Sequence, residues 1–434
     1  MSRTAHQTLA ALLDDGLFND GDWIESKDQD PNGEVRLIQL ADVGDGVFRD
    51  RSSRFLTMEK AEELGCTFLQ PGDVLVARMP DPLGRACIFP GVDQPAVTAV
   101  DVCILRPSPG RARPEWLVKA INSPGFRSSM QAFVRGTTRQ RISRKNLGTM
   151  SLAVPSVQTQ LEIAGLIDRI ESKRGTAASH VAAARDSVDR FRRAVLFAAC
   201  SGRLTREWRS RQSLQPDSSG KDDVPATWAL TPLGEVAASI RGGSTMVPGD
   251  EPSEYPILRS SSVRSFKVDY DDVRFLTEAQ SQRADNFLEP GDLLITRLSG
   301  SIEYVGNCAL VRELGDRRVQ YPDRLFCCRL NDPPEAPYIE ICFAGPTIRS
   351  QIAEASRSAA GHQRISISDL KKFAISRPPL DEQREIVRRT EDLLALADRL
   401  DDRIVTVSTS IDRSSQAVLA KAFRGDLDAN GGHL

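Results

Sequence analysis

The feature that most constrains this chain is an internal duplication. Residues 140–205 align without a gap to residues 363–428, at a constant offset of 223 positions. Within this match, Gln140-Arg141-Ile142-Ser143 corresponds to Gln363-Arg364-Ile365-Ser366. A repeat of about half the chain indicates one large duplicated unit rather than a solenoid of short repeats. A match of 66 residues that tolerates no insertion is typical of a long packed helix rather than a loop.

Most of each repeat carries apolar residues at coiled-coil spacing. From Ile163 to Val195, ten positions alternate in steps of 4 and 3, and nine of them are apolar. The same positions in the second copy, from Ile386 to Val418, are apolar at eight of ten. This pattern predicts two long helices whose apolar seams face a partner helix. The seam residues that we expect to pack in the coiled coil or to dock a partner are Ile163, Ile170, Val181, Val188, Val195, Ile386, Leu393, Leu400, Val407 and Val418.

The second helix follows a whole globular unit, so the chain has room to return. We therefore predict that the two helices pack antiparallel within one chain. Packing of each helix on its own globular domain, or in a homodimer, is the alternative.

The regions before the two helices share a shorter motif. Pro71-Gly72-Asp73 and Pro290-Gly291-Asp292 each precede alternating aliphatic residues and an arginine, Arg78 or Arg297. This pattern predicts a turn that leads into a strand. The offset here is 219, so the second copy gains four net residues between Arg78 and Gln140.

These patterns predict an α+β fold. Two mixed α/β domains would be separated by a long antiparallel coiled coil, with an internal pseudo-two-fold repeat. The predicted boundaries are 1–154 for the first domain, 155–205 for the first helix, 206–227 for a linker, 228–377 for the second domain and 378–428 for the second helix.

Composition limits the classes of function. The net charge is −2 and the pI is about 6.2, whereas a protein that coats DNA non-specifically is expected to be basic. Any contact with DNA must therefore be local or shared with partners. The chain has no apolar run of membrane-spanning length and no signal-peptide pattern, so we expect a cytoplasmic protein that is not associated with a membrane. Its eight cysteines include no Cys-x-x-Cys pair, which predicts buried thiols and no metal site.

Catalytic motifs are missing from the sequence. No Gly-x-x-x-x-Gly-Lys-Ser/Thr loop is present, which argues against ATP hydrolysis by this chain. Asn331-Asp332-Pro333-Pro334-Glu335 approaches the Asp-Pro-Pro-aromatic motif of adenine methyltransferases, but Glu335 replaces the aromatic residue. We interpret this segment as a surface turn. The chain is predicted not to be an enzyme, and no catalytic residue is assigned.

The openings of the two helices resemble a known family. Pro155-Ser-Val-Gln-Thr-Gln-Leu-Glu-Ile163 and Pro378-Pro-Leu-Asp-Glu-Gln-Arg-Glu-Ile386 are similar to the Pro-Pro-Leu-x-Glu-Gln-x-x-Ile pattern of type I restriction–modification specificity subunits. The Gly-Asp-x-Leu-x-x-Arg strands and the Arg-Ile-Ser turns resemble that family too. The first copy departs from the pattern at Ser156 and Thr159. The second unit opens with Trp228-Ala-Leu-Thr-Pro-Leu-Gly234, as the family often does, and the first unit shows no clear counterpart near residues 8–15.

The resemblance implies a division of labour. The globular domains would be target-recognition domains, each reading one half of a bipartite, asymmetric site in double-stranded DNA. The helices would set the spacing and dock two adenine methyltransferase subunits. S-adenosylmethionine, ATP and magnesium are expected in the methyltransferase and restriction/translocase subunits, and no cofactor in this chain. The resemblance specifies neither the base sequence, nor the spacer, nor whether the effector is a full restriction complex or a methyltransferase alone.

Candidate DNA-contacting residues follow from the chemistry of base recognition. Arginine pairs with guanine and glutamine with adenine through two hydrogen bonds each. The candidates are Arg78, Arg85, Arg139, Gln140 and Arg141 in the first domain, and Arg297, Tyr304, His362, Gln363 and Arg364 in the second. Residues repeated in both domains are more suited to scaffold or phosphate roles than to reading unlike bases.

Two alternatives differ in class, and a third stays within the family. A coiled-coil scaffold would bind protein and not DNA. A specificity subunit could also serve another phage-defence effector. A methyltransferase fused to its own recognition domain is disfavoured, because the cofactor loop is missing and the Asp-Pro-Pro motif is broken.

Overall fold

The computed structural model describes residues 5–80, 82–133, 140–212, 224–284, 286–357 and 363–424. The chain divides into two compact units, Met1–Val181 with Thr406–Leu434, and Ala182–Val405. Each unit contains a mixed α/β domain and one half of each of two long helices, α6 (Val157–Cys200) and α13 (Leu380–Arg424). The predicted α+β fold is confirmed.

The first domain is built around an antiparallel four-stranded sheet. Its strand order is β2 (Leu17–Asp20), β8 (Val102–Arg106), β5 (Val74–Ala77) and β6 (Ala86–Ile88). Beside it lies a sheet of β4 (Phe55–Leu56), β3 (Val35–Ile38) and β7 (Ala96–Thr98), in which β3 and β7 are parallel. The helices are α2 (Met58–Glu63), α3 (Pro114–Asn122), α4 (Pro124–Gln131) and α5 (Arg144–Thr149).

The central strand β5 is buried on both faces. Val74 and Val76 pack against the Trp116 cluster of α3, whereas Leu75 and Ala77 pack against Ile38 of the second sheet. Because side chains alternate along a strand, four consecutive apolar residues can serve two cores.

The second domain repeats this plan. Its four-stranded sheet has the order β11 (Ala237–Gly242), β18 (Leu325–Leu330), β16 (Leu293–Thr296) and β17 (Cys308–Leu310). Two antiparallel pairs lie beside it, β12 (Pro256–Leu258) with β15 (Val273–Phe275) and β13 (Val263–Arg264) with β14 (Lys267–Val268). The helices are α9 (Glu278–Ala284), α10 (Ala336–Ala344), α11 (Pro346–Arg357) and α12 (Ile367–Lys372).

The first domain begins with the same strand and short helix as the second domain, although its sequence does not reveal them. β1 (Ala5–Thr8) pairs antiparallel with β9 (Ser151–Val154) and leads into α1 (Leu9–Leu12). In the second domain, β10 (Ala229–Pro232) pairs with β19 (Ala374–Arg377) and leads into α8 (Leu233–Val236). The expectation of no counterpart near residues 8–15 is therefore wrong. The two openings share backbone pairing and one buried leucine, Leu9 or Leu233, which is too little identity to detect.

The Pro-Gly-Asp motif has the same structural role in both domains. Gly72 and Gly291 adopt φ values of +95° and +96°, which an L side chain rarely adopts. The carboxylate that follows is buried and accepts two hydrogen bonds from an arginine of the neighbouring strand. Asp73 pairs with Arg106 at 2.7 and 2.8 Å, and Asp292 pairs with Arg329 at 2.7 and 3.2 Å.

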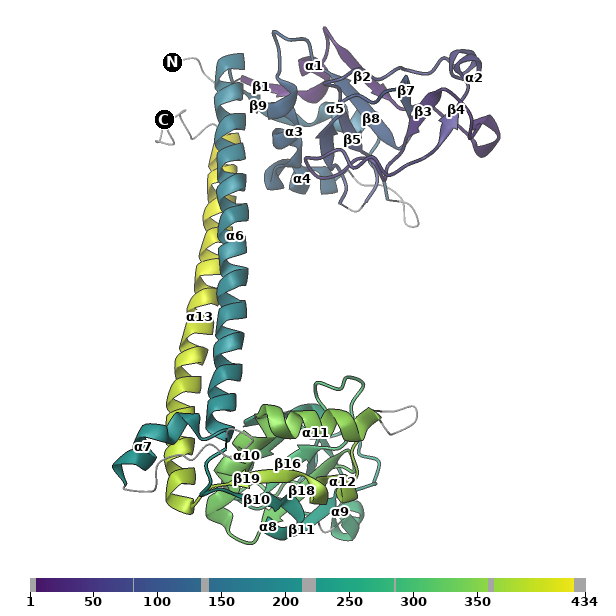
Figure 1. Ribbon diagram of the computed structural model, residues 1–434. Helices are drawn as coiled ribbons and strands as arrows, with labels where there is room; N and C mark the ends of the chain where they lie inside the picture. The colour runs from purple at the N-terminus through teal and green to yellow at the C-terminus, as the bar shows by residue number, and fades with distance from the viewer. Residues whose placement is uncertain are drawn as a thin grey trace. The chain divides into compact units, whose positions relative to one another are not determined.

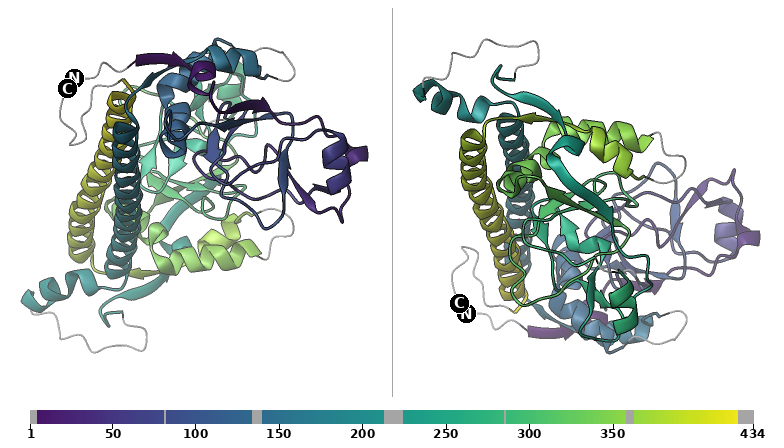
Figure 2. Two further views of the ribbon diagram at one scale, coloured as in Figure 1. Left: turned by 90° about the horizontal axis from the view of Figure 1, so that it is seen from above. Right: turned by 90° about the horizontal axis from the view of Figure 1, so that it is seen from below.

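The two long helices pair with each other in antiparallel fashion (Figure 1). In the first unit, Arg174 of α6 contacts Asp412 of α13 at 2.9 Å. In the second unit, Arg192 contacts Asp398 at 2.6 Å and Asp401 at 2.5 Å, while Arg389 donates to the Leu204 carbonyl beyond the end of α6 at 2.9 Å. Both views in Figure 2 show the helices side by side. The predicted intramolecular pairing is confirmed.

The seam on α6 follows the predicted positions, but the seam on α13 does not follow them throughout. Ile163, Val188, Val195 and Ile386 are buried, and Ile170, Val181, Leu393 and Val418 are partly buried. Leu400 and Val407 are 38% and 51% exposed, so the helix–helix seam does not bury them, and their role in docking a partner stays a prediction. Beyond Ala397 the partly buried positions of α13 include Asp401, Ile404, Ser408 and Ile411, so Ile404 and Ile411 keep the predicted spacing. In the second unit Arg192 of α6 donates to the Asp401 carboxylate at 2.5 Å.

The glutamine of each helix-opening motif ties the helix to its own domain. Gln160 and Gln383 are at most 1% exposed, and each donates its side-chain amide to the motif's first proline carbonyl, at 3.0 Å. In the second unit Glu382 precedes this glutamine and is also buried. It accepts hydrogen bonds from Thr205 at 2.7 Å, Arg209 at 2.5 Å and Trp228 at 3.0 Å.

Glu382 therefore anchors the start of the predicted linker 206–227, which forms a helix, α7 (Arg206–Arg211), after a 3₁₀ turn, η2 (Arg203–Thr205). Thr159 takes the corresponding position in the first repeat and instead contacts the Ser156 hydroxyl at 2.9 Å.

The segment 331–335 is a turn, but its last residue is not on the surface. Pro333–Glu335 forms a 3₁₀ turn in which Glu335 is 3% exposed. Its carboxylate accepts from Arg377 at 2.6 and 2.9 Å and from Gln383 at 3.2 Å. The interpretation as a surface turn is wrong for Glu335, because this carboxylate joins the domain to α13.

All eight cysteines are free thiols, and six of them are buried. Over the residues that the structure describes, none of the helices combines the length and the apolar character needed to cross a membrane.

Candidate nucleic-acid interface

Each domain carries a cavity at the same place in the repeat, where the central strand ends in an arginine. The cavity in the first domain has a volume of about 770 Å³ and is lined by Arg78, Arg141, Arg144 and Lys145 together with Asp20 and Trp23. The cavity in the second domain has a volume of about 680 Å³, and Arg297 and Arg364 line it beside Phe326 and Asp369.

The backbone brings the two shared arginines of each domain together in the same way. The amide of Ile142 donates to the Arg78 carbonyl at 3.0 Å, and the amide of Ile365 donates to the Arg297 carbonyl at 3.0 Å. The Gln-Arg-Ile-Ser turn is therefore bonded to the end of the central strand in both domains. This bond places the arginine of the turn close to the arginine of the strand in both domains.

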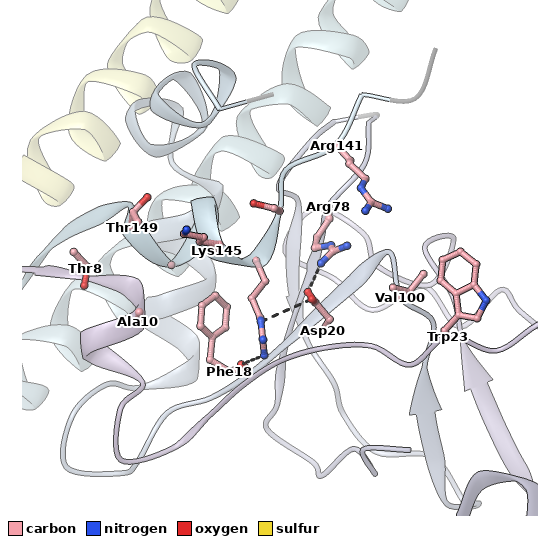
Figure 3. Close-up of a pocket in the computed structure, with 13 residues that line it drawn as sticks. Thr8, Ala10, Phe18, Asp20, Trp23, Arg78, Val100, Arg141, Lys145 and Thr149 are labelled. Carbon is pink, nitrogen blue, oxygen red and sulfur yellow. Dashed lines mark hydrogen bonds and ion pairs between the residues drawn. The ribbon is translucent and has the colours of Figure 1, made fainter. Parts of the chain in front are cut away.

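In the first cavity the strand arginine is buried and paired (Figure 3). Arg78 is 3% exposed and forms an ion pair with Asp20, and its Nε has no hydrogen-bond partner among the described residues. Arg144 donates to the Phe18 carbonyl at 2.9 Å and lies 3.8 Å from Asp20. Burial raises the pKa of the Cys103 thiol, which therefore stays protonated and donates to Asp20 at 3.2 Å.

The turn arginine of the same cavity is exposed. Arg141 has no hydrogen bond or ion pair with any described residue, and Lys145 is exposed on the adjacent helix α5. Figure 3 shows Arg141 and Lys145 near the Arg78–Asp20 pair, with Trp23 farther along the same wall. Four cationic side chains face one carboxylate here, so the cavity is locally positive although the whole chain has a net charge of −2.

The second cavity also contains one arginine that contacts the protein and one that is exposed. Arg297 donates to the Asp323 carbonyl at 3.2 Å, and its guanidinium carbon lies 5.6 Å from the centre of the Phe326 ring. Arg364 is exposed and has no side-chain partner within the described part of the chain. Among the described residues, each cavity therefore offers one guanidinium without a side-chain partner to an anion.

The other candidate residues lie in varied positions. Gln140 and Gln363 are exposed next to the turn arginines. Tyr304 is 43% exposed, and the guanidinium carbon of Arg264 lies 4.8 Å from its ring centre. Arg139 and His362 lie outside the described residues.

Arg85 is 6% exposed and donates to four backbone carbonyls, those of Leu40, Val43, Met79 and Pro82. A DNA-contacting role for Arg85 stays a prediction that this geometry does not favour, because its donors are already used.

Sequence reasoning missed Arg144, Lys145 and Trp23 in the first domain and Arg264 in the second. The search for repeated residues could not find Arg144 and Lys145, because Ile367 and Ser368 replace them in the second copy. The density of basic residues between 139 and 145 is the signal that could have revealed Arg144 and Lys145.

Known proteins with related sequences point to one family. No protein-family model matches the chain. The chain is 32% identical over 326 residues to the type I restriction enzyme EcoKI specificity subunit of Escherichia coli strain K12, a match that covers 74% of this chain and 68% of that protein. It is 25% identical over 434 residues to the EcoBI specificity subunit of Escherichia coli, covering 98% and 86% respectively.

Solved structures agree on the fold. A chain from a study of complex assembly and conformational transition in a type I restriction–modification system superposes with a TM-score of 0.70, at 18% identity and 98% coverage of both chains. The HsdS subunit from Thermoanaerobacter tengcongensis superposes with a TM-score of 0.62, at 18% identity, covering 98% of this chain and 97% of that one. The duplicated α/β domains, the antiparallel helix pair and the similarity to the EcoKI subunit together show that this chain belongs to the family of type I restriction enzyme specificity subunits.

Proposed function

We propose that this chain is the sequence-specific DNA-recognition subunit of a type I restriction–modification complex. Each α/β domain reads one half of a bipartite site in double-stranded DNA. The observation that carries the proposal is the pair of equivalent cavities in two domains of a specificity-subunit family member, each with one exposed arginine that has no side-chain partner in the described part of the chain. Because the rest of the two surfaces differs in sequence, the two halves of the site are unlike.

The shared arginines are suited to phosphate contacts. Arg141 and Arg364 occupy the same position in both domains, so they cannot by themselves distinguish two different half-sites. Arginine contacts to phosphates fix the register of a protein on DNA, whereas base contacts carry the sequence information. Arg78 and Arg297 support the cavity walls, and bases are read by residues that the two domains do not share.

The helices set the distance between the two half-sites and dock the partners. Exposed apolar side chains support a docking role, since Leu396, Leu400 and Phe197 are 38% to 42% exposed on the paired helices. Two adenine methyltransferase subunits would bring S-adenosylmethionine, and restriction/translocase subunits would bring ATP and magnesium. The chain itself contributes binding and no catalytic step, and its DNA target places it in the cytoplasm.

A methylation map tests the proposal. The chain is co-expressed with the modification subunits of its own system, and methylated adenines are mapped across the host DNA. We expect a split, asymmetric motif that disappears when this chain is omitted. A motif that persists without the chain contradicts the proposal. Co-purification with the partners but no motif and no DNA binding would favour a protein-binding scaffold.

A further inference from the structure

One hairpin has the same backbone in both domains and different side chains. In the first domain Val43 and Phe48 form an antiparallel bridge, and in the second domain β13 pairs with β14. Gly46 and Phe266 both adopt a left-handed conformation, with φ values of +76° and +66°. The amide of Gly46 donates to Ala86, at the start of β6, and the amide of Phe266 donates to Cys308, at the start of β17. The two turns are therefore equivalent.

The second domain keeps this turn with a residue that is poorly suited to it. A left-handed backbone strains a phenylalanine, whereas a glycine adopts it freely. The Phe266 side chain is partly buried against the core of the domain, so it anchors the hairpin. Two residues earlier, Arg264 stands where the first domain has Gly44.

An adjacent loop also differs between the domains. Eight residues separate Arg297 from Gly306, whereas five separate Arg78 from Gly84. The longer loop begins at the second cavity, where Leu298 bridges to Arg364 and the Ser299 amide donates to the Gln363 carbonyl at 3.3 Å. Of the four residues gained by the second domain, three therefore lie at the edge of the proposed phosphate site.

A half-buried arginine holds this loop in place. Arg349 of α11 donates to the carbonyls of Val305 at 2.7 Å and of Ile302 and Glu303 at 3.2 Å. The corresponding residue of the first domain, Arg127, instead pairs with Asp45 of the hairpin at 2.6 and 2.9 Å. Ser265 replaces Asp45 in the second domain, so Arg349 is free to fix the loop carbonyls.

The hairpin and the loop meet at Arg264 and Tyr304. The Arg264 guanidinium lies 4.8 Å from the ring centre of Tyr304, and its Nη1 donates to the Val263 carbonyl at 2.9 Å. Both side chains are exposed, and the other N–H groups of Arg264 have no partner among the described residues. A stacked, planar guanidinium keeps its in-plane donors in a fixed orientation, which suits two parallel hydrogen bonds to one acceptor group.

We propose that Arg264, held against Tyr304, reads a guanine in the half-site of the second domain. Arginine recognises guanine through two hydrogen bonds in the major groove. Arg349 and Phe266 are positioning residues that hold the loop and the hairpin. The first domain offers Gly44 and a paired Asp45 at this place, which accounts for an unlike half-site. The inference rests on the proposed DNA-recognition function.

The test uses the full chain with its modification subunits and compares methylation motifs. For Arg264→Ala we expect an unchanged first half-site and a second half-site that is degenerate at one base pair, with discrimination reduced on the order of tenfold or more. Arg264→Lys keeps the charge but not the planar fork, so it should relax the same base pair. Tyr304→Phe keeps the ring and should retain the wild-type motif, whereas Tyr304→Ala should relax it.

The matched control is Arg317→Ala, since Arg317 is another exposed arginine of this domain and lies 5.9 Å from the ring centre of Tyr270. Its motif should remain that of the wild type. The proposal is overturned if Arg264→Ala leaves the motif intact, or if it weakens binding equally on all sequences with a shallower salt dependence, as a phosphate contact would. Failure of the proposed function would show separately, as the absence of any split motif with the wild-type chain.

Discussion

At the scale of single residues, burial separates the arginines that build this protein from those that remain available to a ligand. Arg78 is 3% exposed and paired with Asp20, and Arg85 is 6% exposed and bonded to carbonyls. Arg141 in the cavity of Arg78, and Arg364 in the cavity of Arg297, are exposed and have no described side-chain partner. Sequence identity alone could not make this distinction, because all four belong to the same residue type.

Removal of the exposed arginine in the second cavity should weaken DNA binding without changing its sequence preference. For Arg364→Ala in the assembled methyltransferase complex, we expect lower affinity on specific and non-specific duplexes alike. The slope of log K against log salt concentration should fall by about 1, because one phosphate contact is lost. Fluorescence anisotropy across a salt series measures this slope. A change of the preferred base at one position would instead assign Arg364 to base recognition.

The buried carboxylate of the Pro-Gly-Asp motif should be important for stability. Asp292→Asn leaves Arg329 without its bidentate partner, and we expect the free energy of unfolding to fall by about 2 kcal/mol, since Arg329 itself is partly exposed. Urea unfolding of the full chain measures the loss. Asp250→Asn is the control, because the Asp250–Arg274 pair has the same geometry at the surface and should leave stability unchanged. Equal effects of both substitutions would contradict a scaffold role for Asp292.

At the scale of elements, the helix pair shows how a partner modifies a heptad pattern. The seam on α6 follows the predicted spacing from Ile163 to Val195. On α13 the same spacing places Leu400 and Val407 inward, yet they are 38% and 51% exposed, while Asp401 and Ser408 are partly buried. In the second unit Asp401 is bonded there by Arg192 of the other helix. A heptad pattern identifies the helix and its approximate buried face, but it does not specify how exposed each position along that face is.

A matched pair of valines tests this assignment. Val188→Ala removes a side chain that is 6% exposed in the seam, and the free energy of unfolding should fall by about 1.5 kcal/mol. Val407→Ala makes the same chemical change where the side chain is 51% exposed, and its effect should stay within about 0.5 kcal/mol. Urea titrations of both variants compare the losses. Similar losses of unfolding free energy in the two variants would indicate that Val407 packs in the seam.

The start of α13 should make stability depend on pH. Hydrogen bonds from Arg388, and then from Arg389, lower the pKa of Glu385 from its ordinary value of 4.5 to about 2. A carboxyl with a depressed pKa stabilises the fold above pH 4.5, and this contribution is lost as the pH falls from 4.5 toward 2. Glu385→Gln should therefore cost about 1 kcal/mol at pH 6, a value reduced for solvent screening, and progressively less toward pH 3. Urea unfolding at a series of pH values should show the two proteins converging; a constant difference would contradict the assignment.

At the scale of the whole molecule, one chain carries two versions of one recognition unit. Each domain has its own cores, cavity and helix-opening glutamine, and each unit holds one half of each long helix. Independent domains imply independent half-sites. Replacing residues 228–377 with the equivalent domain of another specificity subunit should change one half of the methylation motif and leave the other half intact. Methylation mapping of the hybrid checks this, and a change in both halves would show that the domains read DNA jointly.

The duplication, the two helices and the family pattern could be predicted from sequence because they depend on regular spacing. An ungapped offset, a 4–3 repeat and a Pro-Gly-Asp turn are local features that need no knowledge of distant contacts. The opening of the first domain was missed for the opposite reason. β1 and β10 are held by backbone hydrogen bonds to β9 and β19, and backbone pairing places few demands on side-chain identity.

The sequence by itself determined that this chain is a duplicated α/β unit joined to coiled-coil helices, since periodicity and repetition depend only on the order of residues. Only the tertiary structure decided the roles of individual side chains. In the structure Arg85 and Glu335 are buried, and Leu400 and Val407 are exposed. Arg264 lies against Tyr304, which comes from another loop. The physical reason is that burial and partner choice depend on residues far apart in the chain, and no local pattern encodes which of them meet.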